Sequence, residues 1–297
     1  MSLEGRVAIV TGAGGGLGRA HARYLAGQGA QVVVNDLQAE AAQKVAREIA
    51  AAGGQAMAIP GSVTDEAAVS ALARRTMQAW GRVDILVNNA GVLRDKSFVK
   101  MTLEDFRFVV DVHLMGAVIC SKAVWEIMRE QRYGRIVMTT SSSGLYGNFG
   151  QANYGAAKMA LVGLTQTLAI EGEKYGVKVN CLAPTAATPM TQGVLSEAGL
   201  DLLDPALVSP GLLALVSEAA PTRAILCAGA GHFACASITL SEGVQIGAGE
   251  SAGQQVLAQW DAISDRAGEI VPPYGFVQAE RELAAAGMTD PVGAVQR

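Results

Sequence analysis

A tyrosine and a lysine stand four residues apart in the segment YGAAK, at Tyr154 and Lys158. Residues at positions i and i+4 of a helix share one face. A free phenol has a pKa of roughly 10 and is a poor base at neutral pH. An adjacent ammonium stabilises the phenolate, so we expect Lys158 to lower the pKa of Tyr154. Tyr154 can then exchange a proton with an alcohol or ketone oxygen.

The residues before this pair decide whether it is more than an exposed YxxxK, which is a common surface pattern. Three serines, at 141–143, follow an apolar, β-branched run. A serine hydroxyl at the end of a strand can donate a hydrogen bond to a substrate oxygen. Tyr146 is a rival phenol, but no lysine follows it four residues later. The order of strand, serine and tyrosine therefore favours a catalytic helix.

A glycine-rich turn follows the first apolar run directly and precedes a helical stretch. It contains Gly12, Gly16, Leu17 and Gly18 within TGAGGGLG. Glycines permit a tight turn that lets backbone amides approach a pyrophosphate at a helix N-terminus. In this context we predict nucleotide binding rather than a simple tight connection.

Asp36 ends the second apolar run, about 20 residues after the glycines, where a carboxylate can accept hydrogen bonds from an adenosine ribose. The same charge would repel a 2′-phosphate, and no Lys or Arg stands inside the glycine turn or directly after Asp36. We therefore predict NAD rather than NADP as the cofactor. An exposed loop aspartate is the alternative interpretation.

Short β-branched runs alternate with longer Ala-rich helical stretches up to about residue 182, as in βαβ units around a parallel sheet. The expected strands are 6–10, 31–35, 55–59, 84–88, 134–140 and 176–182. The expected helices are 17–28, 38–52, 65–79, 103–130 and 153–174, and the capping residues we assign are Thr64, Thr102 and Asn153. We therefore predict an α/β fold with one doubly wound, Rossmann-type parallel sheet.

The pattern becomes irregular after Pro184. We expect a Rossmann-type domain over 1–250, with a substrate lid at about 185–222 and a last strand within 237–246, and a C-terminal extension over 251–297. The stretch LDLLDPALVSPGLLALV, at 200–216, could supply apolar lining to a substrate site or simply pack as helix. Pro and Gly in this region are typical of a loop over a site.

Composition narrows the partners and the compartment. The net charge is −4, without a basic run, so nucleic acid is an unsuitable partner. No apolar stretch of signal-peptide length opens the chain, and the uncharged segment 224–240 is shorter than a membrane span of roughly 20 residues. Four cysteines without CxxC spacing suit a reducing compartment, and Cys227, His232 and Cys235 do not complete a zinc site. We expect a cytoplasmic protein with no metal and no membrane association.

Taken together, these motifs resemble the short-chain dehydrogenase/reductase family. They are TGxxxGxG at 11–18, NNAG at 88–91, a serine 13 residues before the tyrosine, and YxxxK at 154–158. The resemblance implies that Ser141 orients the substrate, that Lys158 also binds the nicotinamide ribose, and that Asn89, Ala90 and Gly91 line the nicotinamide side. It also implies cofactor contacts from residues after the sixth strand, here Pro184 and Ala187.

A narrower likeness, in VVVNDL, NNAGVLRDKSF and DVHLMG among other segments, is to (3R)-hydroxyacyl-CoA dehydrogenase units of peroxisomal multifunctional β-oxidation enzymes. His113 stands where the wider family has an asparagine that helps to hold a proton-relay water. It matches the narrower subgroup, and it is a relay candidate or a packed helix histidine. Ser62 and Val63 replace the Asp-Val pair that contacts adenine in the family.

The family likeness favours oxidation of a secondary alcohol in an apolar substrate, with a (3R)-hydroxyacyl-CoA first and a hydroxysteroid second. Rival readings are a non-catalytic NAD-binding sensor and an NADPH-dependent ketoacyl reductase. By family analogy we expect a homodimer or homotetramer that pairs through helices 103–130 and 153–174. Small residues in the second helix, at 156, 157, 160 and 163, would allow close packing.

Overall fold

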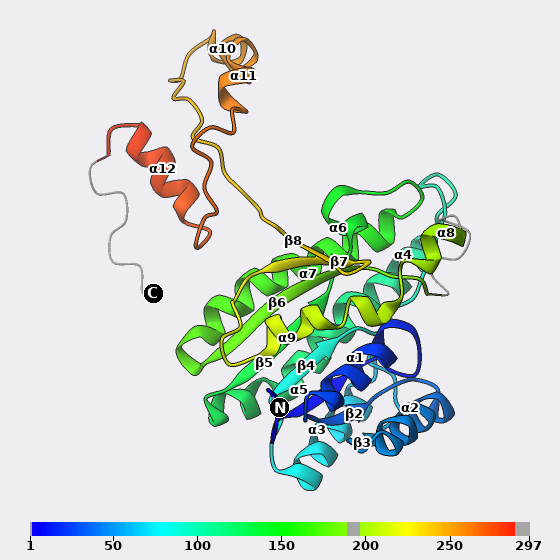
Figure 1. Ribbon diagram of the computed structural model, residues 1–297. Helices are drawn as coiled ribbons and strands as arrows, with labels where there is room; N and C mark the ends of the chain where they lie inside the picture. The colour runs from blue at the N-terminus through cyan, green and yellow to red at the C-terminus, as the bar shows by residue number, and fades with distance from the viewer. Residues whose placement is uncertain (1, 189–196, 289–297) are drawn as a thin grey trace. The chain divides into compact units, whose positions relative to one another are not determined.

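The computed structural model describes residues 2–188 and 197–288. The chain divides into two compact units, Met1–Ala236 and Ser237–Arg297. The first unit is a layered α/β structure in which helices cover both faces of one sheet (Figure 1). It contains every residue that the sequence assigned to the cofactor or to catalysis.

Within the described residues the sheet has eight strands, in the order β3-β2-β1-β4-β5-β6-β7-β8. The strands are β1 Val7–Val10, β2 Gln31–Val34, β3 Gln55–Ala58, β4 Ile85–Asn88, β5 Gly134–Thr139, β6 Val177–Thr185, β7 Ile225–Gly229 and β8 His232–Ala236. All neighbours are parallel except β7 and β8. The chain order reverses between β1 and β4, which is where doubly wound sheets bind their ligands. The predicted fold class is confirmed.

The helices of the first unit connect successive strands. They are α1 Gly16–Gly27, α2 Ala39–Ala51, α3 Glu66–Trp80, α4 Leu103–Val110, α5 Gly116–Gln131, α6 Ser142–Tyr146, α7 Ala152–Gly172, α8 Glu197–Asp201 and α9 Pro210–Val216. A π-helical turn, Asp111–Met115, joins α4 to α5, so the expected helix 103–130 is one rod with a widened turn at its centre. Such turns occur frequently at functional sites.

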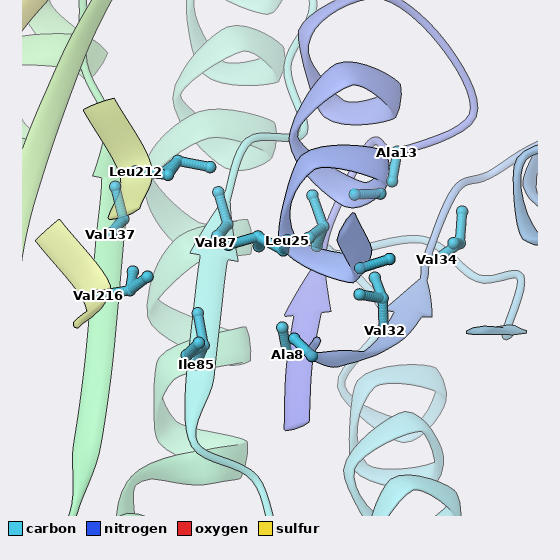
Figure 2. Packing of buried hydrophobic residues seen from close by; sticks show 14 of the residues in the cluster. Ala8, Ala13, Leu25, Val32, Val34, Ile85, Val87, Val137, Leu212 and Val216 are labelled. Atoms are coloured by element: carbon cyan, nitrogen blue, oxygen red, sulfur yellow. The ribbon is translucent and has the colours of Figure 1, made fainter. Parts of the chain in front are cut away.

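Two hydrophobic clusters hold the layers together, one on each face of the sheet. Successive strand residues point to opposite faces, so Val32 belongs to the cluster beneath α1, α2 and α9, and Val33 to the cluster beneath α3, α5 and α7. Figure 2 shows the first of these layers, with Leu25 of α1, Val87 of β4 and Leu212 of α9. A parallel sheet buried on both faces explains the apolar composition.

Helix starts differ in detail from the expected ones. Thr102 caps α4 as predicted, since its side chain accepts from the amide of Asp105. Asp65, rather than Thr64, caps α3. Asn153 lies inside α7, which begins at Ala152, so it is not the capping residue. Its side-chain nitrogen donates to the carbonyl of Arg94.

The expected lid at 185–222 is wrong for its second half. Pro184 does not end the sheet, since β6 continues to Thr185 and Pro184 pairs in register with Ala228. In α9, Leu212 and Val216 are fully buried in the core, so this part of the apolar stretch packs under the sheet rather than lining a substrate site. Residues 189–196 of the expected lid lie outside the described residues.

The last strand expected within 237–246 is also wrong, because the final strands are β7 and β8. A two-residue turn at Ala230 and Gly231 joins them, with φ of 50° and 74°. Positive φ at both positions is the geometry of a type I′ hairpin. The segment 237–246 contains no strand, and Leu240 forms an isolated bridge with Ile270.

The second unit begins at Ser237, earlier than the boundary expected at 250. Its described helices are α10 Ala252–Ala258, α11 Trp260–Ile263 and α12 Val277–Ala285. Residues 289–297 of the expected extension lie outside the described residues. Among the described residues, Leu103–Gln131 alone is long and apolar enough, by length and composition, to cross a membrane, but it packs on α3 and β5 as a helix of the first unit.

Candidate active site

The glycine turn between β1 and α1 packs closely against the residues that follow β4. A Cβ atom on Gly12 would lie 2.7 Å from Cα of Ala90, and one on Gly18 would lie 2.6 Å from Nδ2 of Asn89. Gly12 also has a φ of +61°, which favours glycine. The close approach of two backbone segments therefore requires glycine at both positions.

Thr11 and Asn89 brace this turn. The hydroxyl of Thr11 accepts from the amides of Asn89, at 3.0 Å, and Ala90, at 3.1 Å. In return the side chain of Asn89 donates to the carbonyls of Thr11, at 2.9 Å, and Gly12, at 3.1 Å. The side chain of Asn89 thus holds the cofactor turn in shape, a role that the sequence did not indicate.

Asp36 lies against the glycine turn, 22 residues away from Gly14 in sequence. Its carboxylate accepts from the amide of Gly14 at 2.9 Å and from the amide of Gln38 at 2.9 Å. Helix α1 begins without a side-chain cap, and Leu17 of its first turn packs on the core. An uncapped helix N-terminus next to an acceptor carboxylate fits a pyrophosphate joined to a ribose.

The other expected cofactor contacts, Ser62, Val63 and Ala187, also make contacts within the protein. Ser62 is hydrogen-bonded to Thr64 at 2.8 Å, and Val63 packs against Gly116 at the start of α5. The amide of Ala187 donates to the carbonyl of Leu203 at 2.6 Å.

Thr188 is a further residue at the expected cofactor site that the sequence reasoning did not name. Its methyl group lies 3.5 Å from the position that a Cβ on Gly16 would take, over the start of α1. A threonine soon after the sixth strand was the available signal.

Ser141 and Tyr154 meet at the end of β5. Ser141 caps the short helix α6, accepting from the amide of Ser143 at 3.2 Å, and its hydroxyl also hydrogen-bonds the phenol of Tyr154. Tyr154 lies in the first turn of α7. The structure therefore joins the two hydroxyls that the sequence singled out, with the strand end and the helix start as their supports.

Lys158 lies beneath Tyr154 and is buried. Its Nζ atom donates to the carbonyl of Thr139 at 2.5 Å and lies 5.5 Å from the centroid of the Tyr154 ring. Burial lowers the pKa of Lys158 to about 7. Because this pKa lies near 7, the amine is present in both its charged and its neutral form at neutral pH.

The expected lowering of the pKa of Tyr154 is wrong for this structure. Burial raises the pKa of Tyr154, the hydrogen bond with Ser141 opposes the rise, and the charge of Asp95 adds to it. Lys158 directs its amine at the carbonyl of Thr139. The phenol is consequently protonated at neutral pH, which is the form that donates a proton.

His113 stands in the π-helical turn and faces Tyr154, with ring centroids 5.2 Å apart in an edge-to-face arrangement. Its Nε2 atom lies 2.8 Å from the carbonyl oxygen and 3.1 Å from the amide nitrogen of Val92. Burial and the charge of Lys158 lower the pKa of His113 to about 3, so the ring is neutral. The histidine therefore belongs to the site rather than to general helix packing.

His113 and Lys158 both line a small cavity. Its volume is about 10 Å³, and Asn88, Thr11 and Ala90 are among its lining residues. Within the described part of the chain, Nδ1 of His113 and Oδ1 of Asn88 are buried without a hydrogen-bond partner. A polar cavity of this size is just large enough for one water molecule. Asn88 is thus a further site residue that the sequence reasoning did not name.

The sequence also offers three basic residues, Arg94, Lys96 and Arg223, that could bind the phosphates of CoA at the mouth of the site. Arg94 and Lys96 lie after β4, on the catalytic side, where Lys96 pairs with Asp105 at 2.8 Å. Arg223 precedes β7, and its amide donates to the carbonyl of Val179 in β6. It therefore lies near the N-terminal ends of these strands, whereas the site lies at their C-terminal ends. Arg223 cannot serve the mouth of this site.

Among the residues that the structure describes, no three His, Cys, Asp or Glu side chains gather as metal ligands would. Cys227 instead hydrogen-bonds the exposed phenol of Tyr146, the rival tyrosine.

Residues 6–198 match the family model described as short chain dehydrogenase. The chain belongs to the short-chain dehydrogenase family. It is 50% identical over 227 residues to a Drosophila melanogaster protein named peroxisomal multifunctional enzyme type 2, covering 73% of this chain and 38% of that protein. It is 43% identical over 276 residues to a short-chain type dehydrogenase/reductase of Mycobacterium tuberculosis, covering 90% of this chain and 96% of that one.

Solved structures agree with this family. The full-length peroxisomal multifunctional enzyme type 2 from Drosophila melanogaster aligns with a TM-score of 0.80 at 35% identity, over 96% of this chain and 50% of that one. A 7α-hydroxysteroid dehydrogenase complexed with NADH and 7-oxo glycochenodeoxycholic acid aligns with a TM-score of 0.72 at 33% identity, over 77% and 94%. As a family member the chain is an oxidoreductase with a nicotinamide cofactor. It spans well under two thirds of the fly protein.

Proposed function

We propose that this chain is an NAD-dependent dehydrogenase that interconverts a secondary alcohol and a ketone, with a (3R)-hydroxyacyl-CoA as its substrate. The observation that carries the proposal is the hydrogen bond between Ser141 and Tyr154 beside a buried Lys158, at the same sheet edge as the glycine turn. A non-catalytic NAD-binding sensor would need the turn and Asp36 but not this assembled group.

In the proposed reaction Ser141 and Tyr154 bind the substrate oxygen with two hydroxyl donors. The protonated phenol of Tyr154 gives its proton to a ketone oxygen as the alcohol forms, and takes it back in the oxidative direction. The bound nicotinamide supplies or accepts the hydride. Lys158 replenishes the proton of Tyr154, because its own pKa of about 7 lets it gain and lose a proton near neutrality. His113 and Asn88 hold the water that supplies Lys158.

The cofactor would be held by the elements already described. The amides at the start of α1 would bind the pyrophosphate, and Lys158 would bind the nicotinamide ribose. Asp36 accepts from the adenosine ribose hydroxyls and repels a 2′-phosphate, which favours NAD over NADP. Support for this preference comes from the position of the Asp36 carboxylate on the amide of Gly14.

The substrate proposal rests on similarity. The fly relative and a Mus musculus relative, 47% identical over 227 residues, both carry the name peroxisomal multifunctional enzyme type 2. The 7α-hydroxysteroid dehydrogenase structure makes a hydroxysteroid the second candidate. Arg94 and Lys96 lie on the catalytic side and offer positive charge to the phosphates of CoA.

Assembly and location are further parts of the proposal. Two copies would pair through the helices at 103–130 and 153–174, on which Met115, Met159 and Ile170 are exposed apolar side chains. We expect a homodimer or homotetramer, which a measurement of molecular size in solution would test. We also expect no bound metal, which metal analysis would test, and a cytoplasmic location with no membrane or nucleic-acid partner, which cell fractionation would test.

The test is a kinetic comparison of NAD reduction with (3R)- and (3S)-hydroxyacyl-CoA of several chain lengths and with 3-, 7- and 17-hydroxysteroids. We expect the highest kcat/KM with a (3R) thioester. Preference for a steroid or for the (3S) thioester would overturn the substrate, and no NADH formation with any alcohol would support the sensor instead. A parallel assay measures activity with NADP and with a ketoacyl carrier-protein substrate. It tests the alternative that the chain is an NADPH-dependent ketoacyl reductase.

A further inference from the structure

The loop after β4 is tied to the start of the catalytic helix by three hydrogen bonds in consecutive residues. Asn153 donates from its side chain to the carbonyl of Arg94 at 3.1 Å. Gln151 donates from its side chain to Oδ2 of Asp95 at 2.6 Å. The amide of Lys96 donates to the carbonyl of Gly150 at 2.9 Å. The segment 94–96 therefore lies along 150–153, directly before Tyr154.

These bonds anchor the residues at the N-terminus of α7 but do not cap its backbone amides, and the amide of Tyr154 donates instead to Oδ1 of Asn153 at 2.7 Å. The N-cap residue Gln151 makes no side-chain bond to the helix. Its amide oxygen instead accepts from Asn148 at 3.1 Å, while its amide nitrogen reaches Asp95. An uncapped first turn frays readily, and Tyr154 stands in that turn. The bond from Gln151 to Asp95, together with those of Asn153 and Gly150, therefore helps to hold the turn that carries the phenol.

Asp95 has a second effect on the phenol, through its charge. The groups around Tyr154 are Ser141 from the end of β5, Lys158 from α7 and the neutral His113 from the π-helical turn. Asp95, from the loop after β4, acts on the phenol through its charge. Its negative charge disfavours the phenolate, because like charges repel, and so favours the protonated form of Tyr154.

We propose that Asp95 is a positioning residue for the dehydrogenase reaction, which holds the first turn of α7 through Gln151 and keeps the Tyr154 phenol in its proton-donating form. The inference rests on the proposed role of Tyr154 as proton donor. The Asp95 side chain contributes a hydrogen bond and a negative charge, and different substitutions remove one or both of them.

The test compares Asp95→Asn with Asp95→Ala. Asparagine keeps an acceptor oxygen for Gln151 but removes the charge, and alanine removes both. With Asp95→Asn we expect turnover within about threefold of wild type and a tyrosine titration moved to lower pH by roughly half a unit. With Asp95→Ala we expect the same movement of the titration and a kcat about tenfold lower or more, with the KM for NAD unchanged.

Gln151→Met removes the hydrogen bond to Asp95 but keeps the negative charge of Asp95. It should lower kcat like Asp95→Ala but leave the tyrosine titration in place. Glu104→Gln, at an exposed carboxylate of α4, is the matched control for loss of one negative charge and should change neither quantity.

The titration of Tyr154 is read without substrate, from the ultraviolet difference absorbance of tyrosinate between each variant and the same variant carrying Tyr154→Phe. An unmoved titration in both Asp95 variants would overturn the charge effect, and wild-type kcat in Asp95→Ala would overturn the positioning effect. If Tyr154→Phe alone retained full turnover, the proposed function of Tyr154 would fail instead, whatever the Asp95 variants showed.

Discussion

His113 occupies the space that any side chain at position 91 would need. A Cβ atom on Gly91 would overlap Cε1 of the His113 ring and lie 3.0 Å from its Nδ1 atom. Since the ring also contacts Tyr154 edge to face, Gly91 allows the histidine to reach the tyrosine. The glycine of the NNAG motif is explained by this contact.

Gly91→Ala should therefore displace the His113 ring and lower kcat by about tenfold to a hundredfold, because small shifts of a group at a reacting centre have large effects on rate. Steady-state kinetics of the variant would show this. The double variant Gly91→Ala with His113→Ala provides the control, since it removes the overlap. If the single variant keeps wild-type turnover, the contact has no role in positioning.

Tyr154→Phe should leave NADH binding intact and reduce turnover by about 10²- to 10⁴-fold, because it removes only the proton donor. NADH binding is measured by fluorescence titration and turnover by initial rates. Tyr146→Phe is the matched control at the rival phenol, which is largely exposed. Near-normal turnover in the Tyr154 variant would refute the assignment.

Asp36→Ala should weaken NAD binding by about tenfold and narrow the preference for NAD over NADP, since it removes both an acceptor and a repulsive charge. Asp36→Asn keeps an acceptor for the amide of Gly14 while losing the charge. It should raise the relative affinity for NADP with less damage to NAD binding. Equal cofactor ratios in all three proteins would place Asp36 outside the cofactor site.

Lys158→Met should stabilise the folded chain at pH 7 even as it abolishes catalysis. The pKa of Lys158 is lowered from 10.5 to about 7 on folding, so between these values the unfolded state binds the extra proton and stability rises with pH. At pH 7 and below the full penalty is present, and methionine removes it.

The expected gain at pH 7 is on the order of 2 kcal/mol, after the lost hydrogen bond to the Thr139 carbonyl is subtracted. It should shrink toward pH 10, because the wild-type amine is then unprotonated when folded. Urea unfolding at pH 7 and pH 10 measures both values. A variant less stable than wild type at pH 7 would contradict the burial penalty.

His21 provides a test in acid. It is fully buried in α1, its Nδ1 atom lies 2.9 Å from the hydroxyl of Ser209, and burial lowers its pKa to about 3. Below pH 6.5 the unfolded state takes up a proton that the folded state refuses until about pH 3, so stability is lost progressively as pH falls through this window.

His21→Phe should reduce the slope of unfolding free energy against pH, between pH 6 and 4, by about 1.4 kcal/mol per pH unit, which corresponds to one proton. Urea unfolding at several pH values gives the slope. Ser209→Ala serves as the control because it removes the hydrogen bond without removing the titrating ring. An unchanged slope in the phenylalanine variant would show that His21 titrates normally.

The sequence by itself determined the alternation of strands and helices, the class of fold and the motifs at the glycine turn and at Tyr154. These are local patterns, in which a strand of period two, a helix of period 3.6 and a fixed spacing can each be seen in a short window. The hairpin of β7 and β8 escaped because its turn, Ala230-Gly231, lacks the usual Asn-Gly or Asp-Gly signal.

Only the tertiary structure decided how the site works. The brace of Asn89 on Thr11, the contact of Gly91 with His113 and the bond from Gln151 to Asp95 each join segments distant in sequence. The direction of the pKa shift at Tyr154 likewise depends on burial, which no spacing of residues reveals. Proximity and desolvation arise only when the chain is folded, and they set the protonation state of a catalytic group.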